Sequence, residues 1–161
     1  MKKLIFCMFT CTVLLPVLVC AQTGPSAAPG GLTEKVTRSV RQKELFLDAV
    51  ARGDEAEVRR MVSQRMDVDT RGREGASALM LVPGTQMLRV LLELGADVNL
   101  RDDAGDTALI RFCRRADGRA FVEVLLEAGA DINVRNGAGE SALDVTQDPE
   151  VEKLLVAAGA L

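Results

Sequence analysis

Two segments of the chain have nearly the same amino-acid sequence. Residues 91–100 read LLELGADVNL and residues 125–134 read LLEAGADINV, a recurrence after 34 residues. A period of this length indicates one supersecondary unit used several times. Aligned on the recurring Asp-Val or Asp-Ile pair, the copies predict four repeats, at about 43–71, 72–101, 102–135 and 136–161.

Each repeat carries the same order of local signals. A hydroxyl residue before Ala-Leu predicts the N-cap of a short first helix, at Ser77, Thr107 and Ser141. A glycine predicts the left-handed stop of an apolar second helix, at Gly95, Gly129 and Gly159. The segments 97–106 and 131–140, rich in Asp, Asn and Gly, predict hairpin-like loops. Such a unit cannot bury its own apolar face, so we expect an all-α solenoid of stacked helix-turn-helix units.

On these residues the chain resembles the ankyrin repeat family. The most specific segments are DDAGDTAL at 102–109 and LLEAGADIN at 125–133. The resemblance covers about residues 43–161, and it implies an ankyrin repeat domain that binds another protein. The interval from Leu79 to Leu91 is shorter than the family pattern, so we expect a clipped first helix in repeat 2, near Pro83.

The N-terminus has the layout of a secretory signal peptide at residues 1–21. Two lysines precede an apolar run from Leu4 to Val19 that contains no acid, and the run is short for a membrane span. Cleavage after Ala21 is one outcome; lipidation at Cys20 and an uncleaved anchor are the alternatives. Residues 22–42 are predicted as a flexible linker, with a weak helix start at Thr33. These features predict export to the periplasm or cell envelope, and membrane contact only if Cys20 is lipidated or the signal is retained.

Composition removes several classes of function. The chain has no His, Trp or Tyr, which argues against catalysis by histidine and against the commonest transition-metal ligand. Cys113 is the one cysteine after the signal and is predicted to be a small buried residue. The carboxylates Asp102, Asp103 and Asp106 are read as turn residues. We therefore predict no catalytic, cofactor or metal site, and the net charge of −3 argues against a nucleic-acid partner.

The remaining candidates form a partner-binding surface. The resemblance implies that loop tips and exposed first helices contact the partner, and an arginine-rich stretch lies in the first helix of repeat 3. The predicted residues are Arg73, Glu74, Asp103, Asp106, Arg111, Arg114, Arg115 and Glu140. We expect a non-catalytic interaction module that binds another protein of the periplasm or envelope. The alternative is a membrane-tethered structural component of the envelope.

Overall fold

The computed structural model describes residues 32–160, with side chains from Val36 onward. The predicted signal peptide with Cys20, the linker residues 22–31 and Leu161 lie outside the described residues. Residues from Ser39 onward form one compact unit, which contains all four repeats.

The described residues form seven α-helices and two short 3₁₀ helices, with no β-strand among them. In chain order these are α2 (Leu32–Arg52), α3 (Glu55–Ser63), η1 (Arg73–Gly75), η2 (Ala78–Met80), α4 (Thr85–Glu93), α5 (Ala108–Cys113), α6 (Arg119–Glu127), α7 (Ala142–Val145) and α8 (Pro149–Ala157). None of the described helices is long and apolar enough to cross a membrane.

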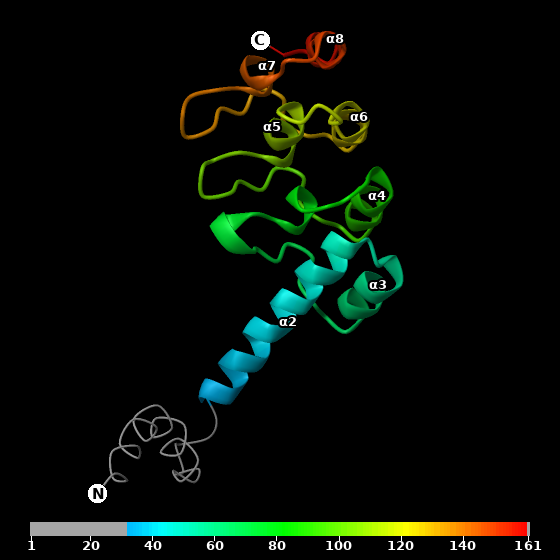
Figure 1. Cartoon of the computed structure of the whole chain (residues 1–161), viewed down its shortest axis with the longest axis vertical. Helices are drawn as coiled ribbons and strands as arrows, with labels where there is room; N and C mark the ends of the chain where they lie inside the picture. The colour runs from blue at the N-terminus through cyan, green and yellow to red at the C-terminus, as the bar shows by residue number, and fades with distance from the viewer. Residues whose placement is uncertain (1–31, 161) are drawn as a thin grey trace, which may run out of the picture. The chain divides into compact units, whose positions relative to one another are not determined.

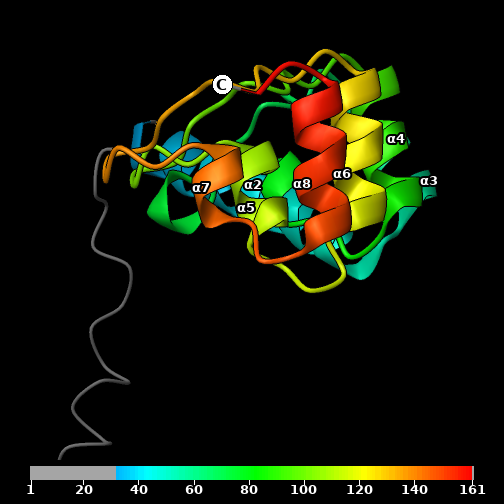
Figure 2. The same cartoon turned by 90° about the horizontal axis from the view of Figure 1, so that it is seen from above.

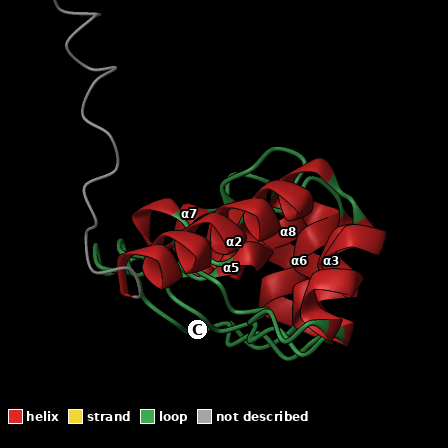
Figure 3. Cartoon of the chain, turned by 90° about the horizontal axis from the view of Figure 1, so that it is seen from below, coloured by secondary structure: helices red, strands yellow, loops and turns green. Residues whose placement is uncertain are grey.

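The helices stack repeat upon repeat. The second helices form one row, in which α4 packs on α6 and α6 on α8, and in the other row α5 packs on both η2 and α7. The loops between repeats project on the side of α5 and α7 (Figure 1). Seen along the stack, the two rows lie side by side (Figure 2), and the described part consists of helices and loops throughout (Figure 3). This arrangement is the all-α solenoid predicted from the repeat.

One apolar core runs through the stack because the second helices place leucines three or four residues apart on their inner faces. Leu88 and Leu91 of α4 are fully buried, as is Leu125 of α6. The core begins at Phe46 in α2 and continues to Leu155 in α8. Full burial of one such side chain contributes about 1.5–3 kcal/mol, so the stacking of neighbours is the main source of stability.

The predicted N-caps are confirmed in two repeats and wrong in one. Thr107 accepts a hydrogen bond from the amide of Ile110, and Ser141 forms a capping box with Asp144. Ser77 makes no such bond, and its hydroxyl is buried without a partner among the described residues. The reason is that the first helix of repeat 2 is one 3₁₀ turn, in which the Met80 amide donates to the Ser77 carbonyl at 3.0 Å. The clipped helix before Pro83 is therefore confirmed.

The predicted glycine stops are confirmed in all three helices. Gly95, Gly129 and Gly159 have φ of 89°, 83° and 100°, the left-handed region that glycine enters without steric cost. The residue after each glycine bonds back to the last helical turn, as the Ala130 amide does to the Leu125 carbonyl at 3.0 Å. In repeat 1 the same position is held by Arg65, at φ 68°.

The predicted linker is too long. Residues 32–42 are the first turns of α2, which runs without interruption to Arg52. The weak start signal at Thr33 is sufficient because the C-terminal half of the helix is anchored by Phe46 and Val50, both fully buried. Once a helix is nucleated, each further residue adds a hydrogen bond at low cost.

Consecutive loops are joined by a ladder of hydrogen bonds. Asp69 accepts from the Asp97 amide at 2.9 Å, and one repeat later Asn99 accepts from the Asp131 amide at 2.8 Å. Arginine side chains repeat the pattern with carbonyl acceptors, as Arg101 donates to the Arg135 carbonyl. Each loop is therefore positioned by the loop before it, which fixes the spacing of the side chains at the loop tips.

Candidate partner-binding surface

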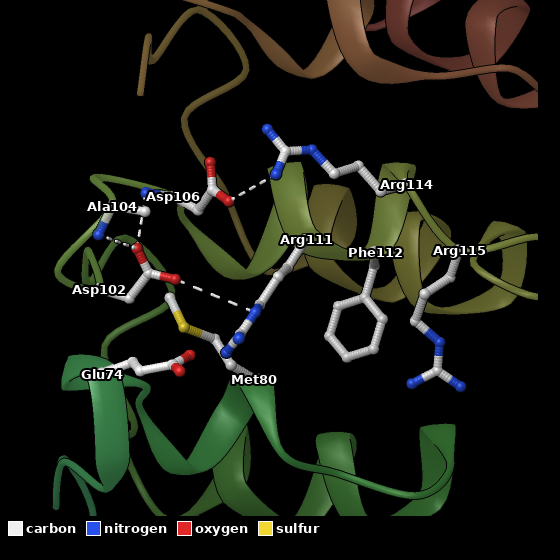
Figure 4. A pocket seen from close by; sticks show the side chains of 9 residues that line it. All are labelled: Glu74, Met80, Asp102, Ala104, Asp106, Arg111, Phe112, Arg114 and Arg115. Atoms are coloured by element: carbon white, nitrogen blue, oxygen red, sulfur yellow. Dashed lines mark hydrogen bonds and ion pairs between the residues drawn. The ribbon is translucent and has the colours of Figure 1, made fainter. Parts of the chain in front are cut away.

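A hollow of about 380 Å³ opens where the loop tips of repeats 2 and 3 meet α5. Figure 4 shows Glu74 entering it from η1 and Arg111 from α5. It is lined by Glu74, Met80, Asp102, Ala104, Asp106, Arg111, Phe112, Arg114 and Arg115. Five of the eight predicted binding residues thus line one cavity, although they come from separate segments of the sequence.

The acidic wall is built by the turn of repeat 3. One carboxylate oxygen of Asp102 accepts from the amides of Ala104 and Asp106, both at 2.9 Å. The side chain of Asp102 is only 6% exposed. The interpretation of these carboxylates as turn residues is therefore right for Asp102, whose main task is to organise the loop.

Arg114 joins repeat 3 to repeat 4. Its guanidinium donates to Asp106 at 3.0 Å and to Glu140 at 2.8 Å. Asn136 donates to the same two carboxylates, at 2.8 and 3.1 Å. The four side chains close a network in which one guanidinium is shared by two acids. Arg114, Asp106 and Glu140, predicted as partner contacts, are therefore already bonded to one another.

Arg111 is less well satisfied. Its Nε lies 3.9 Å from the second oxygen of Asp102, too far for a hydrogen bond. Its Nη1 is buried without any hydrogen-bond partner among the described residues. An unpaired charged donor that has lost water costs free energy on the order of several kcal/mol. Arg111 is thus the cation in the hollow with the most to gain from an added acceptor.

Arg115 forms the opposite edge of the hollow. It makes two hydrogen bonds to Asp117, at 2.9 and 2.7 Å, and this pairing raises the pKa of Arg115 and lowers that of Asp117. Its guanidinium also lies 5.4 and 5.2 Å from the ring centres of Phe112 and Phe121, which stack on each other at 4.4 Å. Arg115 is therefore held in place by both a carboxylate and an aromatic face.

Three predicted residues remain exposed at the loop tips. Arg73, Glu74 and Asp103 make no side-chain hydrogen bond or ion pair within residues 36–160. The backbones of two of them are joined, because the Asp103 amide donates to the Glu74 carbonyl at 3.0 Å. Glu74 itself has φ 57°, a left-handed conformation uncommon outside glycine.

Sequence reasoning missed two kinds of residue in this surface. Met80 and Phe112 supply the apolar floor of the hollow, but in the sequence they look like ordinary core positions. Asn136 was also missed, although it stands 34 residues after Asp102 and its side-chain oxygen accepts from two amides in the same way. The repeat alignment was the signal that could have found it.

Cys113 is buried beside this surface. Its side chain is almost fully enclosed, and burial raises the pKa of the thiol to about 12, so that it stays protonated. The prediction of a small buried residue is confirmed. Within the described part of the chain, no group of three or more His, Cys, Asp or Glu side chains is placed to hold a metal ion.

Comparison with known proteins agrees with the stacked architecture. The family described as ankyrin repeats (3 copies) matches residues 46–136. Ankyrin repeat domain-containing protein 63 of Mus musculus is 38% identical over 80 residues, which are 44% of this chain and 20% of that protein. The Homo sapiens protein of the same name is also 38% identical over 80 residues, or 21% of its length. The chain thus spans about a fifth of each of these relatives. With most of the stack matched by the family and its caps and glycine stops in register, the chain belongs to the ankyrin repeat family, whose repeats serve as protein–protein interaction modules.

Proposed function

We propose that this chain is an exported, non-catalytic adaptor that binds one partner protein through the hollow and the loop tips beside it. The observation that carries the proposal is the buried Nη1 of Arg111, which has no hydrogen-bond partner among the described residues and belongs to a cavity whose rim holds the unpaired carboxylate of Glu74. Export is supported by the charged and apolar layout of residues 1–21.

The chemistry of the hollow indicates which side chains a partner should present. A carboxylate that reached Arg111 would supply the hydrogen-bond acceptor that its Nη1 lacks. A basic side chain over Glu74 would complete the match at the rim. We expect a charge-steered association that weakens as salt is raised.

The first experiment is affinity capture from an envelope extract with immobilised protein, at low and at high salt. Arg111→Gln removes the charge at the centre of the hollow, and we expect about tenfold weaker retention, or about 1.4 kcal/mol. Arg119→Gln is the matched control, because Arg119 is exposed and pairs with Glu123 within α6. Equal retention of both variants would contradict the proposed site.

Arg114 is unsuitable for this test. Its substitution would leave Asp106, a carboxylate only 6% exposed, without its cation. A loss of binding could then follow from a displaced loop instead of a lost contact. The thermal midpoint of Arg111→Gln should be measured alongside capture, to show that the loops have kept their structure.

Export has its own test. The full chain should be expressed with its N-terminus intact, and the mature form identified by intact mass. A mass that begins at Gln22 supports cleavage after Ala21, whereas a mass that begins at an acylated Cys20 supports the membrane-tethered alternative. An unprocessed chain recovered from the cytoplasm would refute both.

A further inference from the structure

We propose that the N-terminal half of α2, residues 36–45, binds a membrane surface rich in anionic lipids. The proposal starts from an uneven distribution of charge. The net charge of the chain is −3, yet residues 32–43 hold one acid, Glu34, and the cations Lys35, Arg38, Arg41 and Lys43. The remainder of the chain is correspondingly more acidic, and within residues 36–45 Glu44 is the one acid beside Arg38, Arg41 and Lys43.

These cations are free to meet an anionic surface. Every residue from Val36 to Leu45 is exposed. Arg38, Arg41 and Lys43 make no ion pair or hydrogen bond within residues 36–160. The arginines of α5 and the turn after it differ, since each of them faces a carboxylate of the repeat domain. Arg38, Arg41 and Lys43 thus have no competing partner among the described residues, whereas Arg52 at the end of α2 pairs with Asp48.

Apolar side chains lie on the same helix. Val36 and Val40 are 60% and 50% exposed, and their spacing of four residues places them on one face. Lys43 follows one turn later on this face, where its long methylene stem can cover apolar surface while the ammonium reaches headgroups. Apolar residues combined with flanking cations are the pattern of a helix that lies in a membrane interface.

The helix also needs a covering surface. Residues 36–45 extend α2 by almost three turns in which every residue is exposed, and helical segments of this length are marginal in water. Adsorption to a bilayer would bury the two valines and favour the helical state. This gain comes in addition to attraction of roughly 1 kcal/mol for each basic residue near an anionic surface.

A lipid surface fits better than an acidic protein because of what precedes α2 in the sequence. The interval from Cys20 to Leu32 can span at most about 40 Å when fully extended. If the chain is held at its N-terminus, by the acyl group or by the uncleaved signal, α2 must remain within reach of the headgroups. A basic segment next to a single weak anchor converts marginal membrane binding into stable binding.

The test is co-sedimentation of residues 22–161 with vesicles, so that neither the signal nor an acyl group contributes. This segment retains every core residue, since the core runs from Phe46 to Leu155. Vesicles of phosphatidylcholine alone are compared with vesicles of equal parts phosphatidylcholine and phosphatidylglycerol. Arg41→Glu is compared with Arg65→Glu, the same change of charge at an exposed arginine of the repeat domain.

We expect binding to the anionic vesicles only, abolished by high salt and reduced about tenfold by Arg41→Glu, with Arg65→Glu close to wild type. Val40→Ser should lower binding by a smaller factor, about threefold. Binding to neither kind of vesicle, equal binding to both, or equal loss in the two glutamate variants would overturn the proposal. So would loss of a captured protein partner in Arg41→Glu without any vesicle binding, because α2 would then contact protein.

Discussion

The loop tips of repeats 2 and 3 form equivalent turns that are stabilised differently. In repeat 3 the turn is organised by Asp102, whose carboxylate accepts two backbone amides. In repeat 2 the equivalent position is Gly72, which has no side chain to offer. Both loops contain a left-handed glycine, Gly75 and Gly105, and repeat 2 adds a second left-handed residue at Glu74. One loop is held by a side chain and the other by backbone conformation.

The glycine at position 72 lies close to a residue outside the loop. A Cβ at position 72 would lie 2.9 Å from the Cδ1 of Leu47 in α2, so that an aspartate there requires this leucine to move. Glycine at this position leaves room for Leu47 of α2.

The largest effect should follow from removing the side chain that organises repeat 3. Asp102→Ala leaves two amides without their acceptor and Arg111 without the carboxylate that faces it, and we expect a loss of about 3 kcal/mol in the free energy of unfolding. Urea denaturation measures this value. Asp102→Asn should recover most of the loss, since Asn136 performs the same task in repeat 4. A cost below 1 kcal/mol for the alanine variant would show that the turn holds without its side chain.

The two N-cap positions should respond differently. Thr107→Ala should cost about 1 kcal/mol, because Thr107 caps α5. Ser77→Ala should be neutral or slightly stabilising, since the Ser77 hydroxyl is buried without a partner and its removal relieves a desolvation penalty. Urea midpoints of the two variants measure the contrast. Equal destabilisation would mean that Ser77 has a hydrogen bond in solution.

Glycine substitutions at equivalent positions of the two loops should change the free energy of unfolding by small amounts and in opposite directions. Glu74→Gly should raise the free energy of unfolding by a little under 1 kcal/mol, because glycine enters the left-handed region without strain. Ala104→Gly, at the equivalent position of repeat 3, should lower it by about 0.5 kcal/mol, since φ there is not positive and glycine only adds freedom to the unfolded chain. Thermal midpoints that shift in the same direction would refute this account.

The smallest expected effect is on the loss of stability at low pH. Hydrogen bonds from the backbone and hydroxyl of Ser141, helped by the charge of Arg135, lower the pKa of Asp144. A lowered folded-state pKa adds stability above the ordinary value near 3.9, and this stability is lost as pH falls through the folded pKa. The wild type should therefore lose slightly more stability than Asp144→Asn between about pH 5 and 2. Parallel denaturation curves across this range would exclude a role for the cap.

The repeat period was enough to predict the solenoid, the two working N-caps and the glycine stops, because these depend on local sequence. The length of α2 could not be predicted, since its first turns depend on the burial of Phe46 and Val50 further along the helix. Ser77 does not cap a helix because the helix after it is shortened to one 3₁₀ turn. The shortened helix was predicted from the sequence, but the loss of the hydrogen bond to the Ser77 hydroxyl was not.

The binding surface was predicted as a set of residues but not as a structure. The sequence indicates a run of arginines, and it does not indicate that Arg114 is shared by two acids while Arg111 lacks an acceptor. That distinction comes from distances between repeats.

The ladder of loop hydrogen bonds has a consequence for enlarging the protein. Asn99 meets Asp131 in the way that Asp69 meets Asp97, and Asn133 holds the same position in the loop of repeat 3. A duplicate of residues 102–135 inserted after Arg135 should therefore find the same loop contact on its parent, but Glu123 would stand in the place of Arg89 beside the added copy of Glu127 and should be changed to arginine. The stack could then be lengthened one repeat at a time, and each added repeat would carry its own copy of the α5 arginines, with Ala104 and Ile110 of its parent in place of Glu74 and Met80.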